Sequence, residues 1–258
     1  FSLILFYILF ILFNYIKSNM SISIVIPVYN EKNNISLLIS KITSNINRIR
    51  HEIIIVDDSS DDGSKDILKK LSKKKNLKII FRKEKTRDLS KSCRDGFEKS
   101  KFDKILVMDG DLQHNPKYIL RMIKIMKNKN CDVVVGVRDL INSRVKSLSF
   151  FRQSASYILI KFLNLIFGKK TIDPMSGFFL FKKKIYTKNK KLLFLKGFKI
   201  LADLIYVDKN ISVKDLKINF EYRVKGSSKL NYKILIYLLQ FIIFRIFQKT
   251  YRFFKIFT

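Results

Sequence analysis

The stretch ILVMDGDLQHNP, residues 105–116, joins a short apolar run to two carboxylates that flank a single glycine. A short, continuous apolar run of this kind is typical of a strand buried on both faces, as in a parallel sheet. Asp109-Gly110-Asp111 on its own is also ordinary turn chemistry, because aspartate and glycine favour turns. Whether these carboxylates form a turn or a site for a metal ion and a phosphate therefore depends on the rest of the chain.

Around this stretch, short apolar runs alternate with segments of helical spacing. The apolar runs predict strands at residues 21–28, 51–58, 76–81, 103–109 and 131–137. The segments between them predict helices at residues 33–49, 64–74, 89–100 and 116–128, with Ser64 as the N-cap of the second. Strands that alternate with helices of about 10–15 residues predict an α/β fold, in which a mostly parallel sheet is covered by helices on both faces.

After residue 140 the pattern changes. Residues 150–167 predict an apolar helix that carries Arg152, Ser156 and Lys161 and ends at Gly168 as its C-cap. Residues 176–183 predict a strand, and residues 211–224 predict one or two more.

The last segment, residues 232–258, has a helical pattern with two unlike sides. Its first part, ILIYLLQFIIF, is almost wholly apolar. Its second part places one polar stripe opposite three aromatic residues: Arg245, Gln248, Lys249, Arg252 and Lys255 against Phe247, Tyr251 and Phe254. A helix of this kind suits the headgroup boundary of a membrane. A helix that docks on the protein's own core is the alternative.

Residues 1–16 form another strongly apolar segment. It is shorter than the roughly 20 residues that a membrane-spanning helix needs. Met20 stands directly before the first predicted strand. The sequence therefore leaves two interpretations of residues 1–19, which are either a membrane anchor or upstream sequence translated before a start at Met20.

Charge and composition limit the classes of function. The chain carries a formal net charge of +31, and its 47% of apolar residues is enough to build a core. Part of the charge reflects lysine as the default surface residue. No nucleic-acid-binding motif accompanies the cations, and the aromatic residues lie in apolar runs, so a nucleic-acid partner is not expected. The two cysteines, Cys93 and Cys131, are too few for a disulfide framework and are expected to pack in the core.

Polar clusters follow three of the predicted strands, at residues 27–31, 57–63 and 109–114. Ligands in open α/β sheets bind outside the carboxyl ends of the strands, so all three clusters should face one edge. Carboxylates that gather there repel one another unless a cation neutralises them, and a hard divalent cation shared with substrate phosphates does so. The chain has no P-loop and no G-x-G-x-x-G fingerprint to explain a phosphate site otherwise.

Five motifs resemble a known family in their order and approximate spacing: VIPVYNE, IIIVDDSSDDGS, MDGDLQHNP, DPMSGF and RVKGSSKL. They resemble the inverting family 2 glycosyltransferases of the GT-A type. Within these they are most similar to dolichyl-phosphate mannosyltransferases and bacterial polyprenyl-phosphate glycosyltransferases. The resemblance covers roughly residues 21–232. It implies a GT-A catalytic domain over residues 20–230 and a membrane-associated helix over residues 231–258.

The resemblance also implies roles for individual residues. The nucleotide sugar would be held by Pro27, Tyr29, Glu31, Val56 and Asp58, with Gly110 and Lys229 beside the phosphates. Asp109, Asp111 and Gln113 would hold Mg²⁺ or Mn²⁺ on the diphosphate, which also makes Asp111 a catalytic residue. The phosphates of donor or acceptor would be contacted by Arg138, Arg223 and Lys229, and the acceptor phosphate by Arg152 and Ser156.

The reaction implied is transfer of a hexose, mannose from GDP-mannose, to dolichyl or another polyprenyl phosphate at the cytoplasmic face of a membrane. In-line displacement would give a β-linked lipid phosphosugar. The acceptor oxygen is already anionic near neutral pH, so no general base is needed. Transfer of glucose or another sugar from a UDP-hexose to undecaprenyl phosphate is one alternative. A non-catalytic scaffold that binds a nucleotide sugar is another, although the intact Asp109, Asp111 and Gln113 set argues against it.

Two departures from the family pattern, together with His114 and the DPMSGF motif, matter for the site. The segment TRDLSKS, residues 86–92, stands where the family often has a glycine-rich G-L-G-x-A segment, and Gly110 replaces the more usual alanine. His114 is expected to form a hydrogen bond near the following helix rather than to bind a metal. Asp173 and Ser176 of the DPMSGF motif could form a simple turn, but the resemblance implies an active-site loop.

Overall fold

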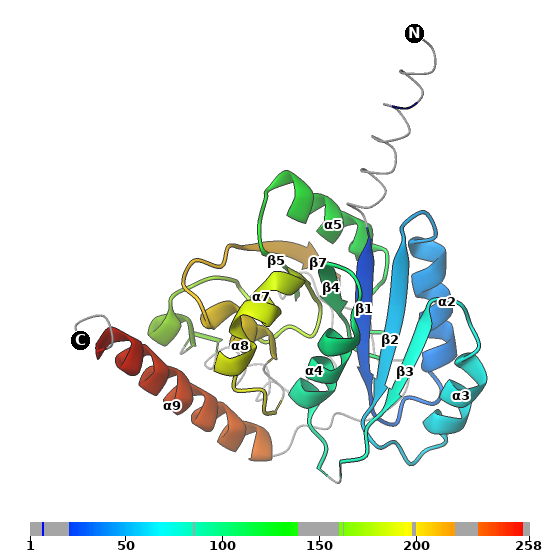
Figure 1. Ribbon diagram of the computed structural model, residues 1–258, viewed down its shortest axis with the longest axis horizontal. Helices are drawn as coiled ribbons and strands as arrows, with labels where there is room; N and C mark the ends of the chain where they lie inside the picture. Colours follow the sequence, from blue (N-terminus) through cyan, green and yellow to red (C-terminus); the bar gives the residue numbers. More distant parts are fainter. Residues whose placement is uncertain are drawn as a thin grey trace.

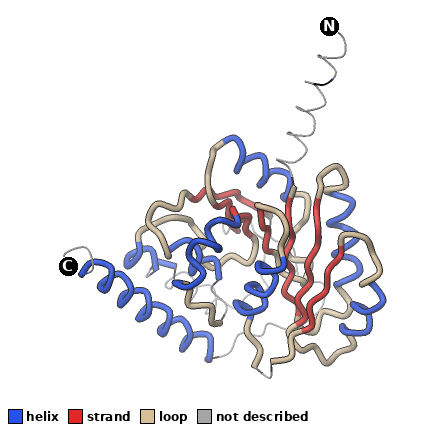
Figure 2. Tube along the Cα trace, in the orientation of Figure 1, coloured by secondary structure: helices blue, strands red, loops and turns tan. Residues whose placement is uncertain are grey.

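The computed structural model describes residues 7, 21–84, 86–138, 160–161, 163–197, 200–219 and 232–254. These residues contain one seven-stranded sheet, with strand order β3-β2-β1-β4-β6-β5-β7. The strands are β1 Ile22–Val28, β2 His51–Asp57, β3 Leu77–Phe81, β4 Lys104–Val107, β5 Val133–Arg138, β6 Phe179–Lys182 and β7 Val213–Ile218. Figure 2 shows this sheet at the centre of the molecule, between two groups of helices.

The sheet is mostly parallel, as the alternating pattern predicts. β1, β2, β3 and β4 pair in parallel, and so do β5 and β7. β6 is the exception, because it runs antiparallel to both of its neighbours, β4 and β5. All seven strands overlap the predicted runs. The orientation of β6 could not be read from its apolar residues, which are the same whichever way the strand runs.

The helices are α2 Ile35–Asn45, α3 Ser64–Leu71, α4 Leu89–Lys99, α5 Tyr118–Asn128, α7 Lys183–Asn189, α8 Ile200–Tyr206 and α9 Tyr232–Phe254, with a 3₁₀ turn η1 at Lys190–Leu192. The sequence did not predict α7, η1 and α8. Gly63, with φ of 87°, is the N-cap of α3, so the prediction that Ser64 fills this position is wrong. Residues 160–161 and 163–167 are helical, and Gly168 follows them with φ of 82°, as expected of a C-cap glycine.

Each face of the sheet is covered by its own group of helices. Alternate residues of one strand belong to two different hydrophobic clusters, as Ile24 and Val25 of β1 show. The first cluster joins the sheet to α2, α3 and α5, and the second joins it to α4, α7 and α8. Cys93 and Cys131 are both buried and unpaired, as expected, and burial raises the pKa of both thiols. The helices on both faces leave the carboxyl ends of the strands as the place for a site.

The C-terminal helix α9 docks on the protein through a small third cluster. Phe241 and Ile242 of α9 pack with Leu163 and with Ala202 of α8, and Figure 1 shows α9 lying along the α8 side of the molecule. Arg245 is 4% exposed and pairs with Asp203 of α8.

The predicted basic stripe is therefore corrected in one position. Arg245 was expected to face membrane headgroups, but it faces the core. The side chains of Lys249, Arg252 and Lys255, which complete the predicted stripe, lie outside the described residues. The spacing did not say which side would be covered. In the part of the chain that the structure describes, no helix is long and apolar enough to cross a membrane. Of residues 1–19, only Tyr7 lies within the described residues.

Candidate active site

The polar ends of β1, β2 and β4 meet at one edge of the sheet, because these strands are parallel neighbours. Gly110 lies directly against the end of β1. A Cβ at this glycine would lie 3.0 Å from Val28 Cγ1 and 3.5 Å from Glu31 Cγ. The Asp109-Gly110-Asp111 turn and the Tyr29–Glu31 cluster are therefore in contact, as the sequence predicts.

The acidic loop after β2 is tied to the loop after β1. The Asn30 N–H donates to Ser60 Oγ at 2.9 Å, and the Asn30 side chain donates to Asp61 Oδ1 at 2.6 Å. The Lys32 N–H donates to Asp62 Oδ2 at 3.0 Å. Burial acts to raise the pKa of Asp62, but hydrogen bonds from Ser64 and from the Lys32 N–H outweigh it and lower the pKa. Hydrogen-bond donors of the protein thus bind the Asp61 and Asp62 carboxylates, without a cation.

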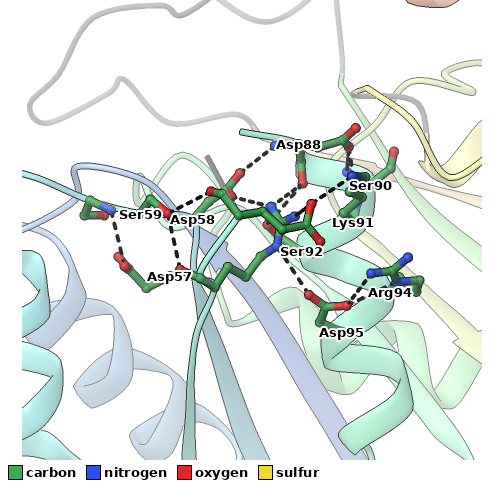
Figure 3. A network of polar contacts seen from close by, with 12 residues as sticks. Asp57, Asp58, Ser59, Asp88, Ser90, Lys91, Ser92, Arg94 and Asp95 are labelled. Carbon is green, nitrogen blue, oxygen red and sulfur yellow. Dashed lines mark hydrogen bonds and ion pairs between the residues drawn. The ribbon is translucent and has the colours of Figure 1, made fainter. Parts of the chain in front are cut away.

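Asp58 belongs to a buried network that joins β2, β3 and α4. Its carboxylate accepts from Arg82, which follows β3, and from the Asp88 N–H at 2.8 Å. The Arg82 side chain is 2% exposed and also pairs with Glu84 and Asp95, at 2.9 and 3.3 Å. Figure 3 shows Asp58 and Asp88 facing each other beside the first turn of α4. Asp58 is thus held rigidly at the edge where the donor is expected.

Asp88 caps α4 and draws a distant loop toward it. Its Oδ1 accepts from the N–H groups of Ser90 and Lys91, and both of its oxygens accept from the Gly197 N–H at 3.0 Å. Burial raises the pKa of Asp88, against the opposing effect of these backbone donors. The residues just before Asp88 also reach the site, because the Arg87 guanidinium lies 3.9 Å from the centroid of the Tyr29 ring.

The two carboxylates of the Asp-Gly-Asp turn differ in exposure. Asp111 is 4% exposed and accepts the Gln113 N–H at 3.1 Å. The Asp109 side chain is 38% exposed, and its carboxylate lies directly on Gly177. A Cβ at Gly177 would clash with Oδ2 and would lie 2.8 Å from Cγ of Asp109. The Asp109 carboxylate can therefore occupy this position only because residue 177 has no side chain.

His114 supports the same turn from inside. It is 4% exposed and stacks on Phe178, with ring centroids 5.1 Å apart and planes 16° apart. The Asp109 N–H donates to His114 Nδ1 at 3.4 Å. His114 thus forms a hydrogen bond, as expected, and holds the backbone of Asp109.

The DPMSGF motif forms the loop that leads into β6 and places Gly177. Asp173 is buried and accepts the Met175 N–H at 3.2 Å. Ser176 Oγ donates to the Gly136 carbonyl at 2.7 Å and accepts the Phe178 N–H at 3.1 Å. Ser176 therefore joins the loop to β5 beside the candidate site.

Three of the remaining predicted site residues lie in strands of the sheet, and the other four are not described. Pro27 pairs with Val56 in the β1–β2 register, and the Val56 side chain is fully buried in the core, so only its backbone is open to a ligand role. Arg138 ends β5, opposite Ile218 of β7. Four predicted residues lie outside the described residues: Arg152, Ser156, Arg223 and Lys229.

The oxygen atoms at the Asp-Gly-Asp turn are suitable ligands for a hard divalent cation. Asp109, Asp111 and Gln113 offer carboxylate and amide oxygens, which Mg²⁺ and Mn²⁺ prefer. Among the described residues, no group of three or more His, Cys, Asp or Glu side chains could hold a metal by itself.

The fold is that of a GT-A glycosyltransferase. Glucosyl-3-phosphoglycerate synthase from Mycobacterium tuberculosis, in complex with UDP, matches with a TM-score of 0.65 and 16% identity, over 89% of this chain and 81% of that chain. The same enzyme in complex with Mn²⁺, UDP-glucose and glycerol 3-phosphate matches with a TM-score of 0.63 and 14% identity, over 90% and 80%. At such identities the likeness establishes the fold alone.

The chain belongs to glycosyl transferase family 2, whose family model matches residues 23–189. The dolichol-phosphate mannosyltransferase of Pyrococcus furiosus is 34% identical over 218 residues, which cover 84% of this chain and 61% of that protein. The dolichol-phosphate mannosyltransferase of Saccharomyces cerevisiae is 29% identical over 231 residues, which cover 84% of each. The match thus spans about three fifths of the Pyrococcus relative and most of the yeast one.

Sequence reasoning did not identify Arg82, Asp88 and Gly177 as parts of the site. Arg82 is one cation among 52 lysines and arginines, so its type carried no signal. Asp88 could have been identified as a helix N-cap, because it stands directly before the predicted helix 89–100. Gly177 lies inside the DPMSGF motif, where a glycine can indicate that another group packs closely against the backbone.

Proposed function

We propose that this enzyme transfers mannose from GDP-mannose to dolichyl or another polyprenyl phosphate, with the help of a divalent cation. The observation that carries the proposal is the placement of Asp109. Gly177 leaves room for its partly exposed carboxylate, and His114 accepts its backbone N–H, at the edge that also holds Tyr29 and Glu31. The names of the relatives support mannose as the sugar and dolichol phosphate as the acceptor.

The cation would be held by Asp109, Asp111 and Gln113, where it would neutralise the charge that develops on the departing diphosphate. Tyr29, Glu31 and the backbone of the β1 and β2 ends would orient the nucleoside. The phosphates of donor and acceptor repel each other, and cationic side chains must bring them together. We assign this role to Arg138, Arg152, Arg223 and Lys229, with Ser156 as an additional donor.

The acceptor phosphate brings its own nucleophile. Its oxygen is anionic near neutral pH, so attack on the anomeric carbon requires alignment rather than proton removal. This fits the site, because His114 is buried and its Nδ1 already accepts the Asp109 N–H. Attack opposite to the leaving diphosphate inverts the anomeric centre and gives a β-linked product.

The test is a panel of labelled donors. Membranes or detergent micelles that contain the protein, polyprenyl phosphate and Mg²⁺ or Mn²⁺ are incubated with GDP-mannose, UDP-glucose or UDP-N-acetylglucosamine. We expect label from GDP-mannose to enter the lipid fraction, and we expect chelation of the cation to stop it. Label from a UDP-sugar alone would replace the donor assignment. No labelled lipid from any donor would refute transferase activity.

We further propose that α9 lies on the cytoplasmic surface of the membrane that carries the acceptor. Its outward side is apolar: Ile236, Leu239, Ile243, Ile246 and Phe247 are all between 45% and 71% exposed. An exposed apolar stripe of this kind suits the boundary between headgroups and acyl chains. Buried, unpaired cysteines fit a reducing compartment such as the cytoplasm.

Replacing Ile243 and Phe247 together by serine should release the protein from lipid vesicles. Each fully buried side chain of this size contributes about 1.5–3 kcal/mol, so we expect membrane affinity to fall by ten-fold or more. The measurement is co-sedimentation with vesicles that contain anionic phospholipid. Leu120→Ser on α5 is the matched control, because Leu120 is 42% exposed and lies on another helix. Equal losses in both variants would argue against a specific role of α9.

A further inference from the structure

One short loop connects the C-terminal helix to the edge where the donor is expected. Residues 193–197 lie between η1 and α8, and buried carboxylates hold both ends. Asp203 of α8 accepts the N–H groups of Phe194 and Leu195, at 3.1 and 2.9 Å. Asp88 accepts the Gly197 N–H at 3.0 Å, and the Gly197 carbonyl accepts the Ser90 N–H at 2.9 Å.

The first end of the loop depends on α9. Arg245 pairs with the Asp203 carboxylate and donates to the Asp203 carbonyl at 2.7 Å. Arg245 and Gln248 also donate to the Leu192 carbonyl, at 3.2 and 3.0 Å. Burial raises the pKa of Asp203, and Arg245 opposes this effect. Without Arg245, the Asp203 carboxylate would be buried with backbone donors alone.

The second end of the loop contacts α9 and also Asp88, which lies at the edge of the sheet where the nucleotide sugar is expected. A Cβ at Gly197 would lie 3.0 Å from Tyr237 Cβ of α9, so helix and loop are in close contact there. Asp88, whose carboxylate accepts the Gly197 N–H, also donates its own N–H to Asp58. Arg82 joins the same two residues, because it pairs with Asp58 and donates to the Asp88 carbonyl at 3.3 Å. A continuous set of contacts therefore runs from α9 to Asp58.

We propose that residues 193–197 act as a relay: they couple the docking of α9 to the affinity of the site for the nucleotide. Asp88 is the positioning residue that connects this loop to Asp58. The proposal rests on the proposed function, because it takes Asp58 as part of the nucleotide site. Coupling between two sites is reciprocal, so nucleotide binding must stabilise the docked loop as much as the docked loop favours the nucleotide.

Two observations favour this coupling over a purely structural role of the loop. Leu195 has a φ of 49°, which is unfavourable for a residue with a side chain, and its N–H is held in this conformation by Asp203. Asp88 lies in the segment TRDLSKS, where a glycine-rich segment was expected. A glycine could not accept the Gly197 N–H through a side chain. The link thus depends on the carboxylate of Asp88.

The test is a double-mutant cycle on nucleotide affinity. The Kd for GDP is measured in detergent for the wild type, Asp88→Asn, Arg245→Met and the double variant, each checked by thermal melting. We expect each single change to weaken GDP binding by about ten-fold. The double variant should bind no worse than the weaker single one, because both changes interrupt the same set of contacts. Lys182→Met is the control, because it breaks a different interelement ion pair, with Asp132.

Hydrogen exchange supplies a readout that a bracing role would not change. We expect GDP to slow exchange at the amides of Phe194, Leu195 and Gly197 in the wild type but not in Asp88→Asn. If Arg245→Met does not fold, Arg245→Lys is used under the same criteria.

Three results would overturn the relay. Wild-type affinity for GDP in the Arg245 variant would overturn it and leave the proposed function standing, and so would losses that simply add in the double variant. A wild type that binds neither GDP nor UDP would overturn the proposed function and the relay together.

Discussion

Replacing Gly177 by alanine should lower sugar transfer by at least about 100-fold while the protein stays folded. The new methyl group would occupy the space of the Asp109 carboxylate, whose Cγ lies 2.8 Å from the position of the added Cβ. Asp109 must therefore turn away from the edge. A misplacement of about 1 Å at a reacting centre can cost about 10²-fold in rate. The loss should approach that of Asp109→Ala, which removes the same carboxylate.

The fold should survive because Asp109 is 38% exposed and has room to move toward solvent. Gly177 has no positive φ that an alanine would strain, so the expected effect is steric. Gly110→Ala is the matched control. Its methyl group would meet Val28 Cγ1 at 3.0 Å, an apolar neighbour rather than a carboxylate, and we expect less than a ten-fold loss. Initial rates of lipid labelling and thermal melting measure the two effects. Wild-type rates in Gly177→Ala would show that Asp109 need not lie where the structure places it.

Most of the sheet could be predicted from the sequence because its strands are short, apolar runs between polar loops. Ile24 and Val25 point to opposite faces and are both fully buried, so the run carries no alternation. This is the sign of a strand covered on both sides. The Asp109–Asp111 turn could be placed at the active edge for a related reason, because parallel strands bring their carboxyl ends together.

What the sequence did not reveal depends on contacts between distant residues. Arg82 pairs with Asp95, which lies on another element, and nothing local distinguishes it from the many solvated cations. Arg245 has the spacing of an amphipathic stripe, but only the position of Asp203 in α8 decides that this arginine is covered. α8 itself is seven residues long and fully apolar around Asp203, which is too short for a helical period to emerge.

Asp88 shows how a departure from a family pattern gains meaning from the structure. In the sequence, TRDLSKS marked only the loss of an expected glycine-rich segment. In the structure, Asp88 caps α4, contacts Asp58 and holds Gly197. The segment is therefore held by side-chain hydrogen bonds of Asp88, which a glycine at this position could not form.

Replacing Arg82 by methionine should destabilise the protein by about 3–5 kcal/mol, because breaking a buried ion pair leaves an uncompensated charge. The Arg82 side chain is 2% exposed, and the Asp58 side chain with which it pairs is 8% exposed. Arg82 also donates to Ser92 Oγ at 3.2 Å and so connects β3 to α4. Methionine has a similar length, which limits the cavity, so the loss reports mainly on the buried charge.

Urea unfolding measures this loss, and a second substitution shows its cause. We expect the double variant Asp58→Asn with Arg82→Met to be more stable than Arg82→Met alone, because the amide removes the stranded charge. Lys69→Met is the control. Lys69 and Asp66 form an ion pair that is 69% and 76% exposed, and such pairs contribute at most about 1 kcal/mol. If Arg82→Met cost no more than Lys69→Met, the Asp58 carboxylate would not depend on Arg82, and the rigid placement of the donor edge would need another explanation.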